Sequence, residues 1–433
     1  MTNHKNEIYT QKFGISEDII SIADAAEKMI APVFERILEV REYNQLKVMH
    51  AMQKNRVGES HFSGTTGYGY DDRGREVLDL VFADVFKAED ALVRHTIVAG
   101  THAIALAMLG NLSCGDHLIS ITGKPYDTLE EMIGIRGDLK GSLKNNGVSY
   151  SQVEMTEEKG IDLENIKKAI RPNTKMVMIQ RSPGYSWRSP VSTDEIKRAA
   201  EFIKSVRQDI IIFVDNCYGE FTQASEPIEA GADLIAGSLI KNPGGGIAQM
   251  GGYVAGREEY VRNSADRLTA PGLGKKLGAT LGQNRFMFQG IFMAPHVVAE
   301  SLKGAVFCAA LMEMLGFAAL PSWNEENRSD IVQAVRFEDP ELLVAFCRGI
   351  QSGSPVDAFV TPEPWEMPGY DCPVIMAAGG FVQGSSIELS ADGPMKPPYI
   401  AYLQGGLVYE SAKLGLLKAV QKMKDIGKIR ISC

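Results

Sequence analysis

The stretch Ala236-Gly237-Ser238-Leu239-Ile240-Lys241-Asn242-Pro243, followed by glycines at 244–246, decides the interpretation of this chain. It is a run of small residues that places a serine three positions before a lysine. An earlier apolar run, 210–214, ends at Asp215, which lies 26 residues before Lys241 (241 − 215 = 26). That separation leaves room for one crossover and a further strand. We therefore expect both residues just beyond strands of one sheet.

These three side chains together favour a pyridoxal 5′-phosphate (PLP) site. The Lys241 amine can form a Schiff base with the PLP aldehyde, and the Ser238 hydroxyl can hydrogen-bond the phosphate. Asp215, at the mouth of a buried strand, can pair with the pyridinium nitrogen. Most lysines are solvated surface charges, so the hypothesis depends on the combination of Lys241 with Asp215.

Composition indicates a soluble globular protein of two or three domains, because 45% of its 433 residues are hydrophobic and 23% are charged. The net charge of −9 argues against nucleic acid as the main partner. Six scattered cysteines without a CxxC pair suggest reduced thiols, and no metal site is predicted. The N-terminus is polar, and no apolar run approaches the roughly 20 residues of a membrane span. We expect no membrane partner and a cytoplasmic location.

Helical and strand patterns alternate between about residues 75 and 255, which predicts an α/β fold. The expected strands are apolar on both faces, so the sheet should be mostly parallel with helices on both faces. Ser192 to Glu195 form a capping box for a helix that runs to about Val206, and Asp162 caps a shorter helix. Ligands bind beyond the carboxyl ends of such strands. The predicted strands are Ala91–Ala99, His117–Thr122, Lys175–Gln180, Asp209–Val214 and Leu234–Ala236.

We predict three parts: an N-terminal helical segment over 1–60, a large PLP-binding domain over 61–290, and a smaller C-terminal α+β domain over 291–433. A long apolar helix, Pro295–Phe317, links the last two. The remaining expected elements are strands at Ser329–Val335, Val356–Val360, Val374–Ala378 and Ile387–Ser390, and helices at Leu342–Arg348 and Leu403–Met423.

Further candidate site residues follow the predicted strands. Gly100 and Thr101 lie between a strand and a helix, where backbone N–H groups favour a phosphate. Tyr126 could stack on the pyridine ring, and we favour this over packing on a loop because it too follows the end of a strand. Ser182 would face the same crevice, and the neighbouring Arg181 and Arg188 could bind a substrate carboxylate or lie in a solvated loop.

Tyr68, Tyr70 and Arg73 come from a glycine-rich stretch, 58–72, which we interpret as a loop. It could reach into the site of a neighbouring subunit, where Tyr and Arg are good phosphate donors. Its glycine content also permits a flexible surface segment. His61, His95 and His102 lack metal-ligand spacing.

In this order, the strand followed by Gly100-Thr101, Tyr126, Asp215 and Ser-x-x-Lys241 resembles the fold type I PLP enzymes. The segments 64–75, 215–220 and 238–246 make the chain similar to the methionine gamma-lyase-like family, also called aluminium resistance proteins and described as candidate cystathionine beta-lyases. The resemblance covers nearly the whole chain and is more specific for cofactor than for substrate.

The resemblance implies roles for individual residues. Lys241 would be the Schiff-base lysine and proton shuttle, and Asp215 would pair with the pyridinium nitrogen. Gly100, Thr101 and Ser238 would hold the phosphate, while Tyr126 would stack on the ring. Tyr68 and Arg73 would reach the phosphate of the partner subunit, with Tyr70 as the alternative tyrosine. A homodimer is then the minimum unit, and a homotetramer is usual in the family.

Two departures from the family pattern concern the site. Ile240 stands where better-known lyases have a threonine, so one phosphate hydrogen bond is lost or replaced. Glu388-Leu389-Ser390 stands where they have Arg-Leu-Ser, and a glutamate would repel a substrate carboxylate. We therefore expect Arg181, Arg188 or Lys396 to take over carboxylate binding.

The expected function is a PLP-dependent carbon–sulfur lyase, of cystathionine beta-lyase or methionine gamma-lyase type. It would act on a small sulfur-containing amino acid and release a thiol, a 2-oxo acid and ammonia. The alternatives are an aminotransferase, racemase or aldolase, kept open by Glu388, and a non-catalytic PLP-binding protein. The sequence leaves open the substrate, beta against gamma elimination, and any role in aluminium resistance.

Overall fold

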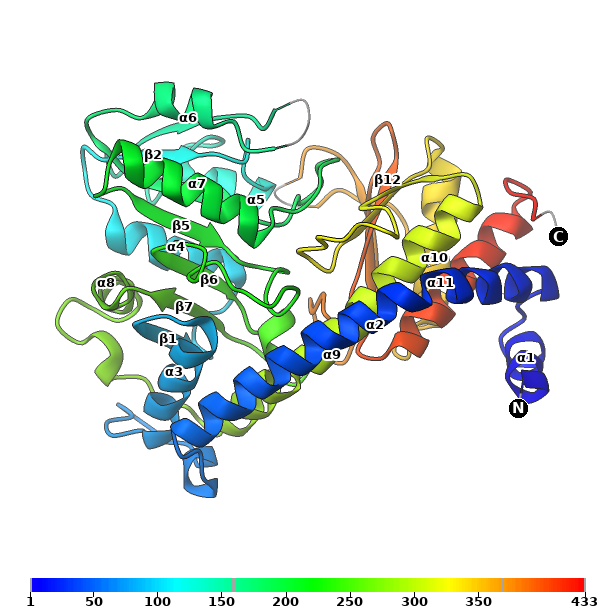
Figure 1. Cartoon of the computed structure of the whole chain (residues 1–433), viewed down its shortest axis with the longest axis horizontal. Helices are drawn as coiled ribbons and strands as arrows, with labels where there is room; N and C mark the ends of the chain where they lie inside the picture. Colours follow the sequence, from blue (N-terminus) through cyan, green and yellow to red (C-terminus); the bar gives the residue numbers. More distant parts are fainter. Residues whose placement is uncertain (1, 157–159, 368–369, 432–433) are drawn as a thin grey trace. The chain divides into compact units, whose positions relative to one another are not determined.

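The computed structural model describes residues 2–156, 160–367 and 370–431 in two compact units (Figure 1). The large unit comprises Glu42–Gly184 and Arg188–Pro295, and the small unit comprises Met1–Arg41, Tyr185–Trp187 and His296–Cys433. Residues 1–41 and 42–60 of the predicted N-terminal segment thus fall in different units. The described residues contain no helix that is both long and apolar enough to cross a membrane.

The large unit is built on a seven-stranded sheet in the order β1-β7-β6-β5-β4-β2-β3. Strands β3, β2, β4, β5 and β6 are parallel neighbours, and β7 pairs antiparallel with both β6 and β1. The carboxyl ends of β4, β5 and β6 therefore share one edge. The strands are β1 Asp90–Arg94, β2 His117–Ser120, β3 Ser149–Gln152, β4 Thr174–Gln180, β5 Ile211–Asp215, β6 Leu234–Ser238 and β7 Gly252–Gly256.

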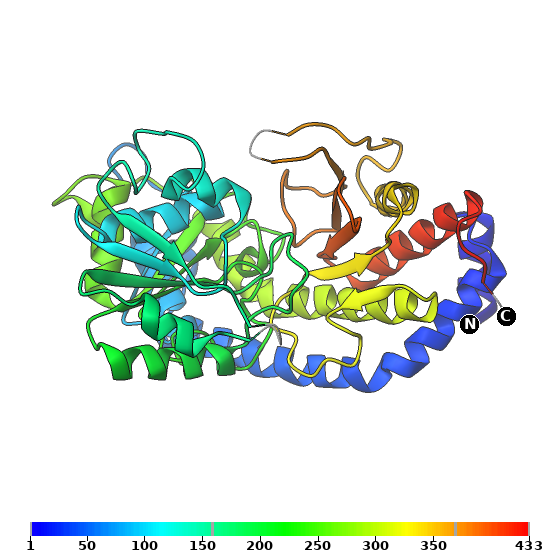
Figure 2. The same cartoon turned by 90° about the horizontal axis from the view of Figure 1, so that it is seen from above.

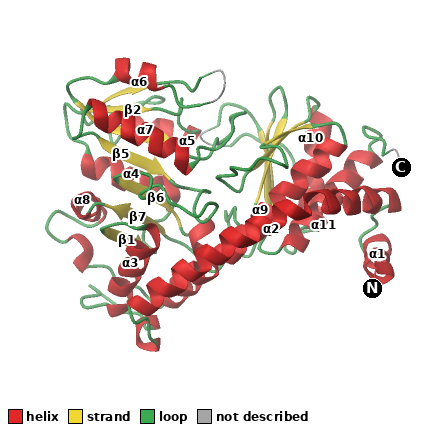
Figure 3. Cartoon of the chain, viewed as in Figure 1, coloured by secondary structure: helices red, strands yellow, loops and turns green. Residues whose placement is uncertain are grey.

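Helices cover both faces of this sheet, as Figure 3 shows by secondary structure. One face, with Leu118, Met178 and Phe213, shares an apolar cluster with residues of α4 and α8. On the other face Tyr253 packs against Phe86 of α3, with ring centroids 5.1 Å apart. The predicted α/β class is confirmed. The helices are α3 Arg73–Phe86, α4 Gly100–Asn111, α5 Asp127–Ile133, α6 Leu163–Ala169, α7 Thr193–Val206 and α8 Glu258–Leu268, with short 3₁₀ turns at Glu59–Phe62, Asn242–Gly244 and Gly274–Lys276.

The predicted helix starts follow from side-chain caps. Ser192 accepts from the Glu195 backbone N–H, and Glu195 accepts from that of Ser192, which completes the capping box of α7. Asp162 accepts from the Asn165 N–H at the start of α6. Both caps satisfy N–H groups that have no partner inside their own helix.

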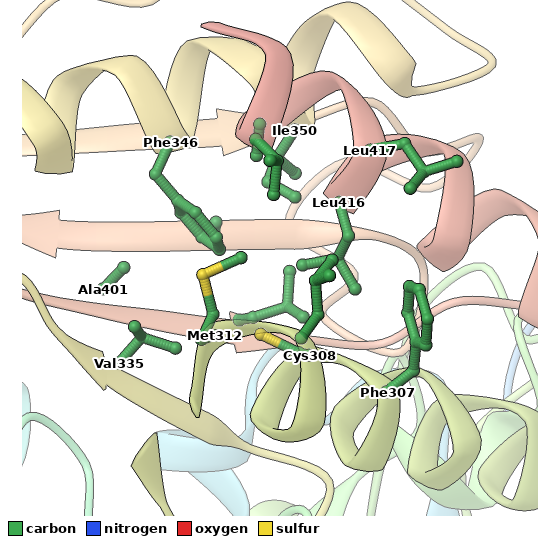
Figure 4. Close-up of a cluster of buried hydrophobic side chains, with 14 of the residues drawn as sticks. Phe307, Cys308, Met312, Val335, Phe346, Ile350, Ala401, Leu416 and Leu417 are labelled. Carbon is green, nitrogen blue, oxygen red and sulfur yellow. The ribbon is translucent and has the colours of Figure 1, made fainter. Parts of the chain in front are cut away.

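The small unit contains a five-stranded antiparallel sheet in the order β10-β11-β12-β9-β8. Helices α10 and α11 lie side by side (Figures 1 and 2). Figure 4 shows the core between sheet and helices, where Phe346, Leu416 and Met312 meet Val335 and Ala401. The elements are α1 Thr2–Gln11, β8 Ala318–Leu320, β9 Gln333–Arg336, α10 Pro340–Gly353, β10 Val374–Ala378, β11 Ser390–Pro394, β12 Ile400–Gln404 and α11 Tyr409–Asp425.

Two long helices belong partly to each unit. Helix α2 spans Glu17–Lys54, and α9 spans Asn284–Met314. We predicted that the latter begins at Pro295. That prediction is wrong, since α9 begins at Asn284 and Pro295 lies inside it. A glycine-rich stretch, 272–282, leads directly into the helix, and local propensity is only a weak guide to such a boundary.

Other predicted boundaries also need correction. Val356–Val360 is not a strand, and β11 begins at Ser390 where the predicted strand ended. The strand predicted over Ala91–Ala99 ends at Arg94. Leu403 lies in β12, not in the last helix, because Gly405 and Gly406 adopt positive φ angles of 80° and 129° and separate β12 from α11.

Candidate active site

Asp215 and Lys241 lie at the shared carboxyl edge of the large sheet. Asp215 is the last residue of β5 and is 4% exposed, and its Oδ1 accepts from the Cys217 N–H at 3.1 Å. Burial raises the pKa of Asp215, and the positive charge of Lys241 counteracts part of that rise. A buried carboxylate of this kind is stabilised by a cation beside it.

Lys241 lies three residues beyond β6, at the start of a 3₁₀ turn. Its Nζ is 3.9 Å from the ring centroid of Tyr218, a cation–π contact. Burial opposes the charge of this ammonium group, but surrounding acidic groups, Asp215 among them, raise the pKa of Lys241 above its ordinary value. These groups favour the protonated form of the free Lys241 amine.

The predicted phosphate ligands come together at the N-terminus of α4. Gly100 opens this helix, and a Cβ placed on it would lie 3.2 Å from Cys217 Sγ and 3.4 Å from Ser238 Cβ. The Ser238 Oγ is buried and has no hydrogen-bond partner among the described residues. A buried hydroxyl without a partner is costly, and the adjacent helix terminus favours an anion. These residues therefore fit a phosphate group.

Tyr126 is joined to the same cradle. Its phenol oxygen lies 3.0 Å from Thr101 Oγ1, and its backbone N–H donates to Gln180 Oε1 at 3.1 Å. Gln180 also donates to the carbonyl of Ser182 at 2.9 Å, so it brings the segments of Tyr126 and Ser182 together. Burial, reinforced by Asp215 and Cys217, raises the pKa of Tyr126, which keeps the phenol neutral.

Arg181 has a different role from the one we expected. Its guanidinium is completely buried and donates to Asn216 Oδ1 at 2.7 Å, to the Gly219 carbonyl and to Gln223. These bonds use the donors that a substrate carboxylate would need. The prediction of carboxylate binding by Arg181 is therefore withdrawn.

Arg188 is half-buried and also holds backbone. Its two terminal nitrogens donate to the carbonyls of Arg181, Ser189, Gln180 and Ser182 at 3.0 to 3.3 Å. These hydrogen bonds to carbonyl groups stabilise the backbone of the segment after β4, which carries Ser182.

Tyr68 and Tyr70 are exposed, at 74% and 60%, with ring centroids 5.8 Å apart. No side-chain hydrogen bond involves them or the exposed Arg73 within the described part of the chain. Tyr68 lines a cavity of about 460 Å³ in the large unit, together with Arg94, Thr96 and His102. Asp215 and Lys241 do not line this cavity.

The loop that carries Tyr68 and Tyr70 is held by hydrogen bonds to two buried side chains, Asp72 and Arg75. Asp72 is buried and accepts from Thr65 Oγ1 and Thr280 Oγ1 at 2.5 Å each, and from the Arg75 N–H. The buried Arg75 guanidinium donates to the carbonyls of Gly69 and Gly278. Sequence analysis missed both anchors, although Asp72 before a helix is a recognisable N-cap signal.

In the small unit, Lys396 is exposed and pairs with Asp371 at 3.3 Å. Glu388 is 2% exposed, and its carboxylate accepts from the N–H groups of Phe381 and Val382 at 2.5 and 2.8 Å. Glu388 therefore holds a turn. The expectation that Glu388 faces a substrate carboxylate is therefore wrong. Glu388 no longer gives a reason to consider an aminotransferase, racemase or aldolase.

Comparisons with known proteins agree with the expected resemblance. The sequence profile of the methionine gamma-lyase family matches residues 19–424. The uncharacterized protein YnbB of Bacillus subtilis strain 168 is 50% identical over 398 residues, which are 92% of this chain and 94% of that protein.

Solved structures are similar over nearly the whole chain. A carbon–sulfur lyase involved in aluminum resistance from Clostridium novyi NT has a TM-score of 0.92 and 48% identity, over 96% of this chain and 98% of that one. A Clostridium acetobutylicum protein, provisionally described as a cystathionine beta-lyase involved in aluminum resistance, has a TM-score of 0.94 and 48% identity, over 98% and 100%. The PLP-dependent protein YhfS from Escherichia coli, at 18% identity and a TM-score of 0.60 over 90% and 97%, shares the fold alone.

Proposed function

Because the chain belongs to the methionine gamma-lyase family, we propose that it is a PLP-dependent carbon–sulfur lyase acting on a sulfur-containing amino acid. The products would be a thiol, a 2-oxo acid and ammonia. The observation that carries the proposal is the buried Asp215 beside Lys241, with the unpartnered Ser238 hydroxyl at the same strand edge. Cystathionine beta-lyase and methionine gamma-lyase activities are the two forms we consider.

PLP would supply an electron sink for the charge that develops at the substrate α-carbon. Lys241 would hold the cofactor and Asp215 would face its ring nitrogen. Ser238, Gly100 and Thr101 would hold its phosphate, with N–H groups of α4 contributing. Ile240 contributes no hydroxyl here, so the hydrogen bond of the family's threonine would fall to Ser238 and Thr101.

For beta elimination two proton transfers are needed, and Lys241 and Tyr126 are the side chains that we propose for them. The Lys241 amine would accept the proton from the substrate α-carbon. As the carbon–sulfur bond breaks, sulfur keeps the electron pair and needs a proton, which the neutral Tyr126 phenol could donate. Water would then convert the released enamine to a 2-oxo acid and ammonium.

The terminal nitrogens of both Arg181 and Arg188 already donate to groups of the large unit. For substrate recognition, Ser182 therefore remains a candidate after β4, and Lys396 remains one in the small unit. Of these two, Lys396 is the cation, and it is exposed.

The test is to incubate purified, PLP-loaded protein with cystathionine, cysteine or methionine and to measure 2-oxo acid. Product with at least one substrate, and none with Lys241→Ala, is the expected result. If wild type and Lys241→Ala give equal amounts for all three substrates, the lyase proposal is wrong. Absorbance spectra across a wider amino-acid panel would reveal transamination or simple binding instead.

A further inference from the structure

Four buried side chains of the large unit form a directional chain of hydrogen bonds behind the site. The Arg181 guanidinium donates to Asn216 Oδ1 at 2.7 Å, and Asn216 Nδ2 donates to Tyr253 Oη at 3.2 Å. Tyr253 Oη then donates to Glu220 Oε1 at 2.9 Å. Every donor points the same way, from a guanidinium to a carboxyl group, and such chains polarise and strengthen each bond.

Glu220 ends this chain in a fully enclosed position. It is 0% exposed, and its second oxygen, Oε2, has no hydrogen-bond partner among the described residues. A Cβ added to Gly237 of β6 would lie 2.5 Å from Glu220 Oε1, so the carboxyl group packs directly on the strand that leads to Lys241. The mechanism proposed above gives Glu220 no part.

Both ends of the segment 215–220 are tied to the site. Asn216 directly follows Asp215, and its N–H donates to the Ala236 carbonyl of β6 at 3.0 Å. The Glu220 carbonyl accepts from Asn242 Nδ2 at 3.0 Å, and Asn242 directly follows Lys241. The chain of bonds thus fixes the residues next to both Asp215 and Lys241.

We propose that Glu220 is a positioning residue for the PLP site, which it holds in register through Tyr253, Asn216 and Asn242 while its carboxyl group is protonated. This inference rests on the proposed function only in taking Lys241 as the PLP-binding residue. The buried Glu220 thereby has a role in the site. Arg181, which we had expected to bind substrate, lies at the opposite end of the same chain of hydrogen bonds.

The surroundings of Glu220 favour the protonated form. Burial raises the pKa of Glu220 to about 8, and the nearby Glu226 adds to the rise. Lys47 Nζ, on α2, lies 4.0 Å from Glu226 Oε1, so its positive charge compensates Glu226 rather than Glu220. The other polar or charged groups around this cluster are Tyr253 on β7, Arg181 after β4, Cys217, and Lys241 after β6.

Ionisation of Glu220 would place an uncompensated charge against β6 and the segment that carries Asp215. We therefore expect PLP to bind less well to wild type as pH rises through about 8. Glu220→Gln keeps the acceptor for Tyr253 but cannot ionise.

The experiment titrates the PLP-free protein with PLP between pH 6.5 and 9.5 and follows the absorbance of the bound cofactor. Glu220→Gln should bind like wild type near pH 7, and the ratio of the two dissociation constants should grow about tenfold by pH 9. Tyr253→Phe, which keeps the stacked ring but removes the bridging hydroxyl, should weaken PLP binding about tenfold. Tyr150→Phe, on the edge strand β3, should change nothing.

A constant ratio of wild type to Glu220→Gln across this pH range would overturn the inference, as would unchanged PLP binding in Tyr253→Phe. If Glu220→Gln does not fold, the Tyr253→Phe titration alone decides. Failure of the lyase proposal would look different, because PLP would still bind with this pH dependence while no 2-oxo acid formed.

Discussion

Ser238 carries the most direct sign of a ligand in this chain. Its buried Oγ has no partner among the described residues, so the hydroxyl contributes little to the fold by itself. A bond to a phosphate would be charge-assisted, with a net value of about 1.5 to 3 kcal/mol. Ser238→Ala should therefore reduce PLP affinity roughly tenfold to a hundredfold, measured by absorbance titration, with little change in the thermal stability of PLP-free protein. Ser205→Ala, at an exposed position on α7, is the matched control.

If Ser238→Ala instead destabilised the PLP-free protein and left PLP affinity unchanged, the hydroxyl would have a structural role. The phosphate assignment would then fall to Thr101 and the N–H groups of α4.

His117 is a buried titratable residue away from the site. On β2 it is 0% exposed and bonds Thr174 Oγ1 of β4 and Ser151 Oγ of β3, at 2.9 Å each. Burial lowers the pKa of His117 to about 4, from an ordinary value near 6.5. The unfolded chain therefore binds a proton that the folded chain resists, and stability present above pH 6.5 is lost as the pH falls toward 4.

We expect the free energy of unfolding to fall by at most about 1.4 kcal/mol per pH unit from this group in that window. His117→Gln should show a shallower acid-side slope in urea unfolding at pH 7, 5.5 and 4.5. The exposed His50→Gln should keep the wild-type slope, and equal slopes for all three proteins would contradict the assignment.

At the scale of helices and strands, the sequence predicted best those boundaries where a side chain caps a helix or where a buried apolar run forms a strand. The capping box at Ser192 and the end of β4 at Gln180 were predictable, because local chemistry decides them, and the end of β5 was predicted one residue too early, at Val214. The start of α9 was not predictable, since a glycine-rich stretch, 272–282, leads directly into it and local propensity does not locate the boundary. The break between β12 and α11 depends on two glycines whose positive φ angles the sequence only permits.

Site residues divide in the same way. The location of Asp215, Ser238 and Lys241 at the carboxyl ends of two strands was predictable from the apolar runs before them, while their roles toward PLP stay predictions. Arg181 was misassigned, since nothing in the sequence shows that its donors are used by Asn216 and Gln223. Glu220 was missed as a site residue because its importance comes from its burial, not its spacing.

The loop before α3 is held by hydrogen bonds to one carboxylate, that of Asp72. Asp72 caps α3 and also accepts from Thr65 and Thr280, which tie the loop to the segment before α9. Asp162 caps α6 but is only partly buried, and among the described residues its carboxylate bonds only Asn165. Asp162→Ala should therefore cost about 1 kcal/mol of unfolding free energy, and Asp72→Ala about 2 to 4 kcal/mol. Urea unfolding measures both, and equal losses would mean that the loop bonds contribute nothing beyond the cap.

At the scale of the whole molecule, the tyrosine loop of the large unit bears on how chains associate. Two large side chains of this loop and the segment paired with it, Tyr68 and Leu281, are 74% and 64% exposed. Leu281 donates its N–H to the Thr65 carbonyl, so it belongs to the segment paired with the tyrosine loop. We propose that a second copy of the chain covers these residues and that Tyr68 or Tyr70, together with Arg73, then reaches the partner's site.

We accordingly expect light scattering to give the mass of at least two chains, with four chains as the expected assembly. Leu281→Glu places a charge in the proposed contact and should shift the mass toward one chain at micromolar concentration. PLP affinity should fall with it, because the Tyr and Arg donors would come from the lost partner. Ile426→Glu, at a comparably exposed position in the small unit, should alter neither property. A wild-type protein that runs as a single chain with PLP firmly bound would show that one chain completes its own site, and Tyr68, Tyr70 and Arg73 would then have no role in phosphate binding.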